Sequence, residues 1–127
     1  MSGLLDRQTH CLLVQPAFSR NSFWNYREVC ALVGARYPAA PLGLLTVAAL
    51  LPPSWQVRLV DENTDALTDD QLSWADVVLT GGMLPQQVAI LRVLRRAHQL
   101  GKPVVVGGPD PTSQTSIYDA ADFRVAG

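Results

Sequence analysis

The segment PLGLLTVAALL at residues 41–51, followed closely by VRLVDEN at residues 57–63, decides the fold of this chain. The first stretch predicts an apolar helix that opens on a proline and a glycine, and the second predicts a strand that ends abruptly in two acids and an amide. A helix that leads into an apolar strand is typical of a parallel α/β sheet, in which helices connect the strands. Ligands of such sheets bind at the carboxyl edge, where the end of this strand is expected.

Apolar runs alternate with helical patterns along the rest of the chain as well. Arg58 and Arg124 interrupt two of the runs, which places those strands at the edges of the sheet, whereas the other runs are continuously apolar, as expected of strands covered on both faces. The sequence therefore predicts a flavodoxin-like (Rossmann-like) α/β three-layer sandwich, with a five-stranded parallel sheet in the order 2-1-3-4-5. The predicted strands are Cys11–Gln15, Gln56–Val60, Asp76–Thr80, Pro103–Val106 and Phe123–Ala126.

The helices between these strands carry their own signals. Leu42–Leu51 is apolar almost all round, so we expect it to be deeply buried. A capping-box pattern at Thr68 predicts the start of a short helix that ends at Trp74. Ser113–Ala121 is a weaker pattern and predicts a single short helix. The strongest amphipathic pattern is Leu84–Leu100, capped by Gly101, with an apolar stripe expected at Leu84, Val88, Leu91 and Leu94.

Two features depart from a minimal domain of this type. Ala17–Ala40 is much longer than an ordinary strand-to-helix loop and is rich in aromatic residues, among them Phe23, Trp24 and Tyr26. It is interpreted either as a lid or docking surface over a site, or as an extra helix packed on the core. No closing helix is predicted after the fifth strand within these residues, so we expect apolar side chains of strands three to five to be open to water on one face. Self-association is then the expected way to cover them.

Composition indicates one globular domain and excludes several classes of partner. The 127 residues have a formal net charge of -1, which offers no electrostatic footprint for nucleic acid or an anionic membrane. The longest apolar stretch is too short to span a bilayer, and the first ten residues lack the uninterrupted apolar run of a signal peptide. Cys11 and Cys30 are interpreted as reduced thiols, and the expected location is cytoplasmic.

Three polar or glycine-marked turns fall at the predicted carboxyl edge: Asp61-Glu62-Asn63, Thr80-Gly81-Gly82-Met83 and Gly107-Gly108-Pro109-Asp110. Glycine lacks a Cβ and therefore lets a flat ligand approach the backbone closely. The two glycine pairs follow adjacent strands and should lie side by side. They are interpreted either as tight turns or as parts of a ligand site, and their equivalent positions beside an acidic turn favour the site.

The sequence lacks the signatures of several other sites. There is no GxGxxG after the first strand and no GxxxxGK[ST], so the dinucleotide and P-loop fingerprints are absent. Pro16-Ala17-Phe18 follows the first strand, where a flavodoxin would have a phosphate loop and a receiver domain would have acids. His10 and His98 are expected at the surface, away from the carboxyl edge. No catalytic residue and no metal-ligating cluster is predicted.

With these turns placed, the chain resembles the N-terminal cobalamin (B12)-binding domain of B12-dependent radical SAM proteins. More widely, it is similar to anaerobic magnesium-protoporphyrin IX monomethyl ester oxidative cyclases. The D-x-H-x-x-G motif of many cobalamin-binding modules is missing, as is usual in the radical SAM branch, and Thr80-Gly81-Gly82 stands in place of S-x-L. The likeness is strongest to the branch that includes hopanoid C2-methylases, and it is carried by Phe23-Trp24, residues 41–51, Leu59-Val60-Asp61, Ala75-Asp76 and Val106-Gly107-Gly108-Pro109.

The resemblance implies a cobalamin-binding domain over residues 1–127, with the cofactor held base-off and with no protein histidine on the cobalt. It places a 4Fe-4S cluster and S-adenosylmethionine in a downstream radical SAM domain, because these residues contain no CxxxCxxC motif. The implied enzyme methylates an unactivated carbon. The alternatives are an oxidative cyclase with the same cofactors and a flavodoxin-like interaction module that binds no cofactor. The residues assigned to the cofactor by resemblance are Pro16, Leu42, Gly43, Asp61, Asn63, Thr80, Gly81, Gly82, Met83, Gly107, Gly108 and Pro109.

Overall fold

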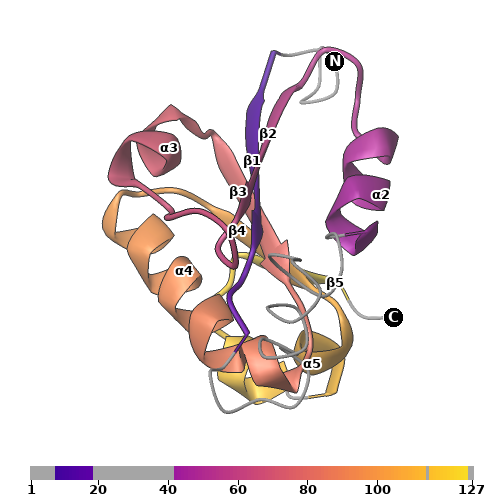
Figure 1. Ribbon diagram of the computed structural model, residues 1–127, viewed down its shortest axis with the longest axis vertical. Helices are drawn as coiled ribbons and strands as arrows, with labels where there is room; N and C mark the ends of the chain where they lie inside the picture. The colour runs from indigo at the N-terminus through magenta and orange to yellow at the C-terminus, as the bar shows by residue number, and fades with distance from the viewer. Residues whose placement is uncertain (1–7, 19–41, 114, 126–127) are drawn as a thin grey trace, which may run out of the picture.

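The computed structural model describes residues 8–18, 42–113 and 115–125, which are arranged around one twisted sheet (Figure 1). Within these residues, parallel strands are hydrogen-bonded in the order β2-β1-β3-β4-β5, which confirms the predicted flavodoxin-like topology. The bounds of each strand lie within one residue of the prediction. They are His10–Gln15 for β1, Gln56–Asp61 for β2, Val77–Gly81 for β3, Val104–Gly107 for β4 and Phe123–Val125 for β5.

The register of the strands determines which side chains share a face of the sheet. Leu12 is in register with Val78, and Val78 with Val104, so these side chains line one face. Their neighbours along the strands, such as Leu13 and Leu79, line the opposite face, because successive side chains of a strand alternate. Helices α3 (Asp69–Trp74) and α4 (Gln87–Gln99) cover the first face, and α2 (Leu42–Leu50) lies against the second (Figure 1).

The face under α3 and α4 carries the hydrophobic core. Helix α3 begins with the predicted capping box, in which Gln71 donates its N–H to the Thr68 hydroxyl and accepts the Thr68 N–H. Gly101 follows α4 with a φ of 72° and donates its N–H to a carbonyl of the last turn, so the predicted cap is confirmed. The strands contribute Leu12, Val14, Val78, Val104 and Val106 to this core, and the helices contribute Leu72, Ile90, Val93, Leu94 and Ala97.

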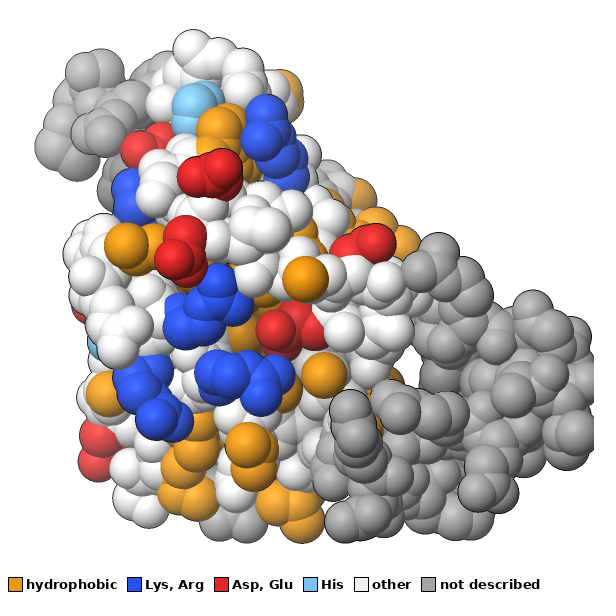
Figure 2. Space-filling model, turned by 60° about the vertical axis from the view of Figure 1, so that its left-hand side comes forward, with side chains coloured by type: hydrophobic (Ala, Val, Ile, Leu, Met, Phe, Trp, Pro, Cys, Tyr) orange, Lys and Arg blue, Asp and Glu red, His pale blue; other side chains and the backbone are white. Residues whose placement is uncertain are grey.

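The apolar stripe predicted for α4 is partly wrong. Leu94 is buried, but the side chains of Leu84 and Val88 are 60% and 74% exposed. The buried stripe runs through two alanines, Ala89 and Ala97, whose small side chains let α4 lie close to the sheet at helical spacing. The 3₁₀ turn η2 (Leu84–Gln86) precedes α4. Figure 2 shows the resulting outer surface, with basic side chains over α4 and hydrophobic side chains beneath them.

Helix α2 is much more exposed than predicted. The side chains of Leu45, Val47 and Leu50 are 44%, 39% and 80% exposed, so the prediction of deep burial is wrong. The helix contacts β1 and is apolar on every side. Because only one side of a helix can face the sheet, the remaining apolar side chains of α2 stay at the surface.

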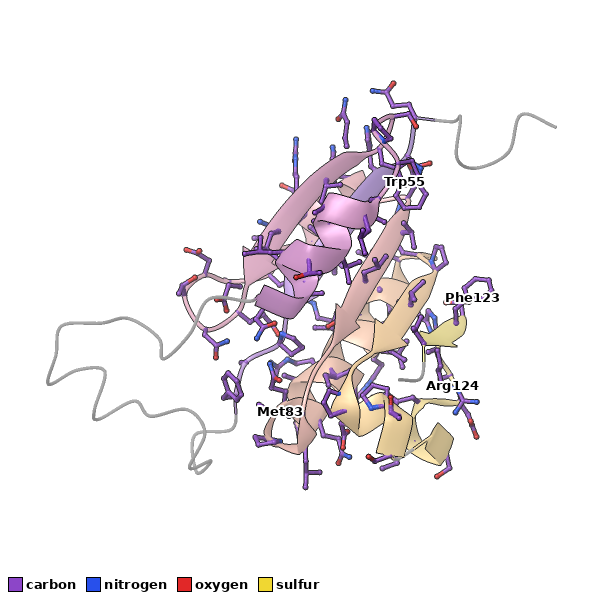
Figure 3. All side chains as sticks on the ribbon, turned by 90° about the vertical axis from the view of Figure 1, so that its right-hand side faces the viewer. Trp55, Met83, Phe123 and Arg124 are labelled. Atoms are coloured by element: carbon purple, nitrogen blue, oxygen red, sulfur yellow. The ribbon has the colours of Figure 1, made fainter. Side chains whose placement is uncertain are left out.

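The half of this face that β3, β4 and β5 form is open, as predicted. Phe123 and Val125 are 66% and 60% exposed, and Leu79 and Val105 are half-buried. Figure 3 shows α2 on one side of this region and the labelled Phe123 on the other, with Met83 beyond the carboxyl end of β3. We call these four apolar side chains, Leu79, Val105, Phe123 and Val125, the open half of the sheet.

The connection from β4 to β5 differs from the prediction. It forms the short helix α5 (Pro109–Ser113) and the 3₁₀ turn η3 (Thr115–Tyr118), instead of one helix over Ser113–Ala121. Both pack at the carboxyl end of the sheet, below β4 in Figure 1. Most of the aromatic segment Ala17–Ala40 lies outside the described residues, so its interpretation as a lid stays a prediction. Among the helices that the structure describes, none is long and apolar enough to cross a membrane.

Candidate binding edge

The carboxyl ends of the strands bring the predicted turns together. Gly81 of β3 is in register with Gly107 of β4, so the two glycine pairs lie side by side, as predicted. Asp61 ends β2, and Pro16 follows the last residue of β1 beside it. Seven of the sequence-predicted residues, including Asn63 after β2, therefore meet at one edge.

Three further predicted residues lie around this edge. Leu42 begins α2, and because α2 runs antiparallel to the strands, its N-terminus points toward the carboxyl edge (Figure 1). Met83 leads from β3 into η2 and is half-buried, and Pro109 begins α5 and is exposed.

Asp61 and Asn63 join the turns that follow β1 and β2. One oxygen of Asp61 accepts the backbone N–H and the side-chain amide of Asn63, each at 2.9 Å. The Asn63 amide also donates to the Pro16 carbonyl at 3.3 Å, and its oxygen accepts the Phe18 N–H at 3.0 Å. Both side chains therefore shape the edge by holding its backbone.

Thr80 and Gln86 connect β3 to β1 in the same way. The buried Thr80 hydroxyl donates to the Val14 carbonyl at 2.9 Å, so in this arrangement it does not donate a hydrogen bond to a ligand. Gln86 is only 2% exposed; its amide donates to the Pro16 carbonyl at 2.9 Å, and its oxygen accepts the Met83 N–H at 3.0 Å. Sequence reasoning missed Gln86, although an amide side chain three residues after a glycine turn is a recognisable capping signal.

Three of the edge glycines are required by the fold itself. A Cβ on Gly81 would lie 1.9 Å from the Gly107 carbonyl oxygen, and a Cβ on Gly82 would lie 2.2 Å from the Gln86 amide oxygen. Gly108 has a φ of 97°, which side chains other than glycine rarely adopt, and it approaches the Gly82 backbone. These three glycines need no ligand to explain them.

Gly43 and Gly107 are different, because no described neighbour requires them to be glycine. A Cβ on Gly107 would meet Val125 at 3.6 Å, an ordinary contact, and a Cβ on Gly43 would meet no described atom within 4 Å. Both positions lie toward the α2 side of the sheet, Gly107 because it alternates with the core residue Val106. Among the described residues, no side chain fills the space next to these two positions.

Asp110 is a second residue that sequence reasoning did not assign a role at the edge. It is 3% exposed, and one carboxylate oxygen accepts the Gln87 amide at 3.0 Å and a short hydrogen bond from the Tyr118 hydroxyl. Burial, the hydrogen bond to Asp110 and its negative charge together raise the pKa of Tyr118 above its ordinary value. The Asp110 N–H donates to the Gly82 carbonyl at 2.9 Å, which ties α5 to the turn after β3.

Glu62 carries a buried oxygen that no described residue contacts through a hydrogen bond. Its side chain is 9% exposed, and while Oε2 lies 3.7 Å from a guanidinium nitrogen of Arg92, Oε1 has no hydrogen-bond partner among the described residues. A buried carboxylate oxygen without a donor costs free energy, so it needs an explanation. Glu62 follows β2 on the α4 side of the edge.

Both histidines of the sequence lie at the opposite, amino edge of the sheet. His10 begins β1 and stacks on Trp74 with ring centroids 4.5 Å apart. His98, near the end of α4, lies 2.9 Å from Asp122, which also accepts the Val104 N–H where β4 begins. In the ranges that the structure describes, no group of three or more His, Cys, Asp or Glu side chains is placed to hold a metal ion.

Comparison with known proteins associates this chain with methyltransferases. No protein-family model matches it. An uncharacterized methyltransferase of Synechocystis sp. is 41% identical over 116 residues, which cover 90% of this chain and 22% of that protein. A hopanoid C-2 methylase of Rhodopseudomonas palustris is 36% identical over 126 residues, which cover 99% of this chain and 24% of that protein. The chain thus spans less than a quarter of the length of these relatives, and it is homologous to part of a hopanoid C-2 methylase, the branch that its sequence resembles.

Proposed function

We propose that this chain is the cobalamin-binding domain of a larger radical SAM methylase. Its homology to part of a hopanoid C-2 methylase supports the methylase, and the resemblance described above supports the cofactor. The observation that carries the proposal is the pair Gly43 and Gly107, because no described residue requires glycine at either position. A flavodoxin-like sheet binds ligands at this edge.

The described residues are compatible with a flat ligand that has a long tail. Gly43 and Gly107 would flank the tail, and Leu79 and Val105 of the open half of the sheet would give it an apolar floor. Pro16, Met83 and Pro109, from three different turns, would lie at the rim. The hydrogen bonds that involve Asn63 and Gln86 hold these turns in place before any ligand binds, which lowers the ordering cost of binding.

When bound, cobalamin would carry the methyl group that such a methylase transfers to carbon. We propose that it binds without a protein histidine on the cobalt, because His10 and His98 both lie at the amino edge. Base-off binding is proposed from the resemblance alone. The iron–sulfur cluster and S-adenosylmethionine belong, in this proposal, to another part of the whole protein. The cytoplasm remains the location we propose.

The placement of the tail is tested by adding bulk at Gly107. Hydroxocobalamin is titrated into the wild-type chain, into Gly107→Val and into Ala66→Val, which introduces the same side chain at an exposed loop position. We expect Gly107→Val to raise the dissociation constant at least tenfold, about 1.4 kcal/mol, and Ala66→Val to leave it within about twofold. Full affinity in folded Gly107→Val would overturn the placement.

A second titration distinguishes the tail from the corrin ring. Cobinamide lacks the nucleotide tail, so we expect it to bind more weakly than hydroxocobalamin and to be insensitive to Gly107→Val. Electron spin resonance of the bound Co(II) form should show no splitting by a nitrogen ligand. Such splitting would contradict base-off binding without histidine.

A further inference from the structure

The best-connected buried polar cluster of the described residues lies directly beneath the glycine turns. Asp110 is 3% exposed and Tyr118 is fully buried, and a short hydrogen bond joins the Tyr118 hydroxyl to Asp110. The Gln87 amide donates to the same carboxylate oxygen at 3.0 Å. The three side chains come from α5, η3 and the first residue of α4, so this carboxylate connects all three elements.

This cluster controls where the turn after β4 lies. Helix α5 has only five residues, Pro109–Ser113, so its own hydrogen bonds hold it weakly. Its position is set by the Asp110 side chain and by the Asp110 N–H, which donates to the Gly82 carbonyl at 2.9 Å. Thr112 in turn donates its N–H and its hydroxyl to the Gly108 carbonyl, at 3.1 and 2.8 Å. The carboxylate of Asp110 is thus connected to both glycine pairs.

The geometry of the two turns leaves little tolerance for movement. A Cβ on Gly108 would already lie 3.0 Å from the Gly82 nitrogen, so the two backbones are in close contact. If α5 moved toward β3, these backbones would collide, and if it moved away, the Asp110–Gly82 hydrogen bond would break. A buried, paired carboxylate therefore selects one relative position of the turns.

We infer that Asp110 is a positioning residue for the carboxyl-edge site, which with Tyr118 and Gln87 holds the two glycine turns in the arrangement that accepts the ligand. The inference rests on the proposed function of that edge. Asp110 is itself too deeply buried to touch a ligand, so it acts through Gly82 and Gly108. Loss of the carboxylate should let the turns sample other positions, and only the aligned fraction would bind.

The first test needs no ligand. Hydrogen exchange is measured on the wild-type chain, on Asp110→Asn and on Asp122→Asn, the matched control. Asp122 is a carboxylate at the opposite end of β4, where it accepts the Val104 N–H at 2.7 Å. We expect Asp110→Asn to raise exchange at least tenfold at the amides of residues 110 and 112, and Asp122→Asn to leave those amides unchanged. Unchanged exchange in Asp110→Asn would overturn the inference, whatever the chain binds.

The second test measures affinity. Hydroxocobalamin is titrated into both variants and into Tyr118→Phe, which keeps the ring and removes only the hydroxyl donor, at a temperature where all are folded. We expect about tenfold weaker binding for Asp110→Asn, weaker binding of smaller size for Tyr118→Phe, and less than twofold change for Asp122→Asn. Equal effects of the two Asp→Asn substitutions would show that Asp110 acts only through global stability and would overturn the inference. Absence of binding in the wild type would instead refute the proposed function.

Discussion

Alanine substitutions at Gly81 and Gly107 should have opposite effects on stability, although the two residues are neighbours in the sheet. The Cβ of Gly81→Ala would lie 1.9 Å from the Gly107 carbonyl oxygen, where real Cβ atoms are found beyond about 3.0 Å. The backbones of β3 and β4 would have to separate by about 1 Å at a place where they are hydrogen-bonded. Overpacking of this kind costs about 1–3 kcal/mol of unfolding free energy.

Gly107→Ala has no such cost. Its Cβ would lie 3.6 Å from the Val125 oxygen and 3.7 Å from the Val125 Cβ, and its φ is not in the left-handed region. Alanine reduces the conformational entropy of the unfolded chain, so this variant should be more stable than the wild type by about 0.4–1 kcal/mol. In thermal unfolding, a change of 1 kcal/mol corresponds to about 3–6 °C for a domain of this size.

The assay is urea unfolding followed by circular dichroism, with all three chains at one protein concentration. The midpoint should rise for Gly107→Ala and fall for Gly81→Ala, at an unchanged denaturant slope. If Gly107→Ala destabilises the chain as much as Gly81→Ala does, then the fold requires both glycines. The argument that Gly107 leaves room for a ligand would then be refuted.

Three further predictions concern stability. Burial raises the pKa of the Cys11 thiol from 9.0 to about 11, so the stability that its protonated form contributes is complete below about pH 9 and is lost as pH rises toward 11. This loss can reach about 2.7 kcal/mol of unfolding free energy. In Cys11→Ala, the unfolding free energy should therefore fall less steeply at alkaline pH than in the wild type. The hydrogen bonds from His98 and from the Val104 N–H lower the pKa of Asp122, so the stability that its carboxylate contributes is present above the ordinary pKa of aspartate and is lost as pH falls through the lowered pKa. The unfolding free energy of Asp122→Asn should therefore depend less on pH than that of the wild type below about pH 4. An identical pH dependence of the two chains would contradict this prediction. Ile90→Ala should lower the free energy of unfolding by about 2–5 kcal/mol. Val88→Ala, at a side chain that is 74% exposed, should change it by less than about 0.5 kcal/mol in urea unfolding. Comparable losses would show that Val88 is part of the buried stripe.

Strand positions and their order were predictable because they depend on short local patterns. Arg58 and Arg124 marked the edge strands, and the structure shows why these positions tolerate charge. The Arg58 guanidinium lies 4.1 Å from the Trp74 ring, and Arg124 pairs with the exposed Asp119. A charged side chain on a central strand, which is covered on both faces, would lack such a partner at the surface.

Helix burial was harder to predict, because it depends on what each helix meets. Helix α2 is apolar on every side, and that pattern does not say how many of its sides are covered. In α4, the alanines at 89 and 97 extend the buried stripe, yet alanine is a weak hydrophobic signal, so the larger side chains of Leu84 and Val88 misled the prediction. Tertiary packing decided both cases.

At the site, the sequence indicated the turns but not what holds them. Glycine pairs after adjacent strands are visible in the sequence, whereas the pairing of Gln86 with Pro16 spans 70 residues. Asp110 was visible only as the last residue of a glycine turn, because its partners Gln87 and Tyr118 come from separate elements. Long-range hydrogen bonds between polar side chains carry no periodic signal, so they appear only once the elements are placed.

Direct mixing with the cofactor tests the central claim most simply. The purified chain is incubated with excess hydroxocobalamin in the dark and passed over a gel-filtration column, and the absorbance of protein and corrin is read across the protein peak. The account predicts that corrin elutes with the protein at about one molecule per chain. A colourless protein peak from the folded chain would contradict it and would favour a flavodoxin-like interaction module.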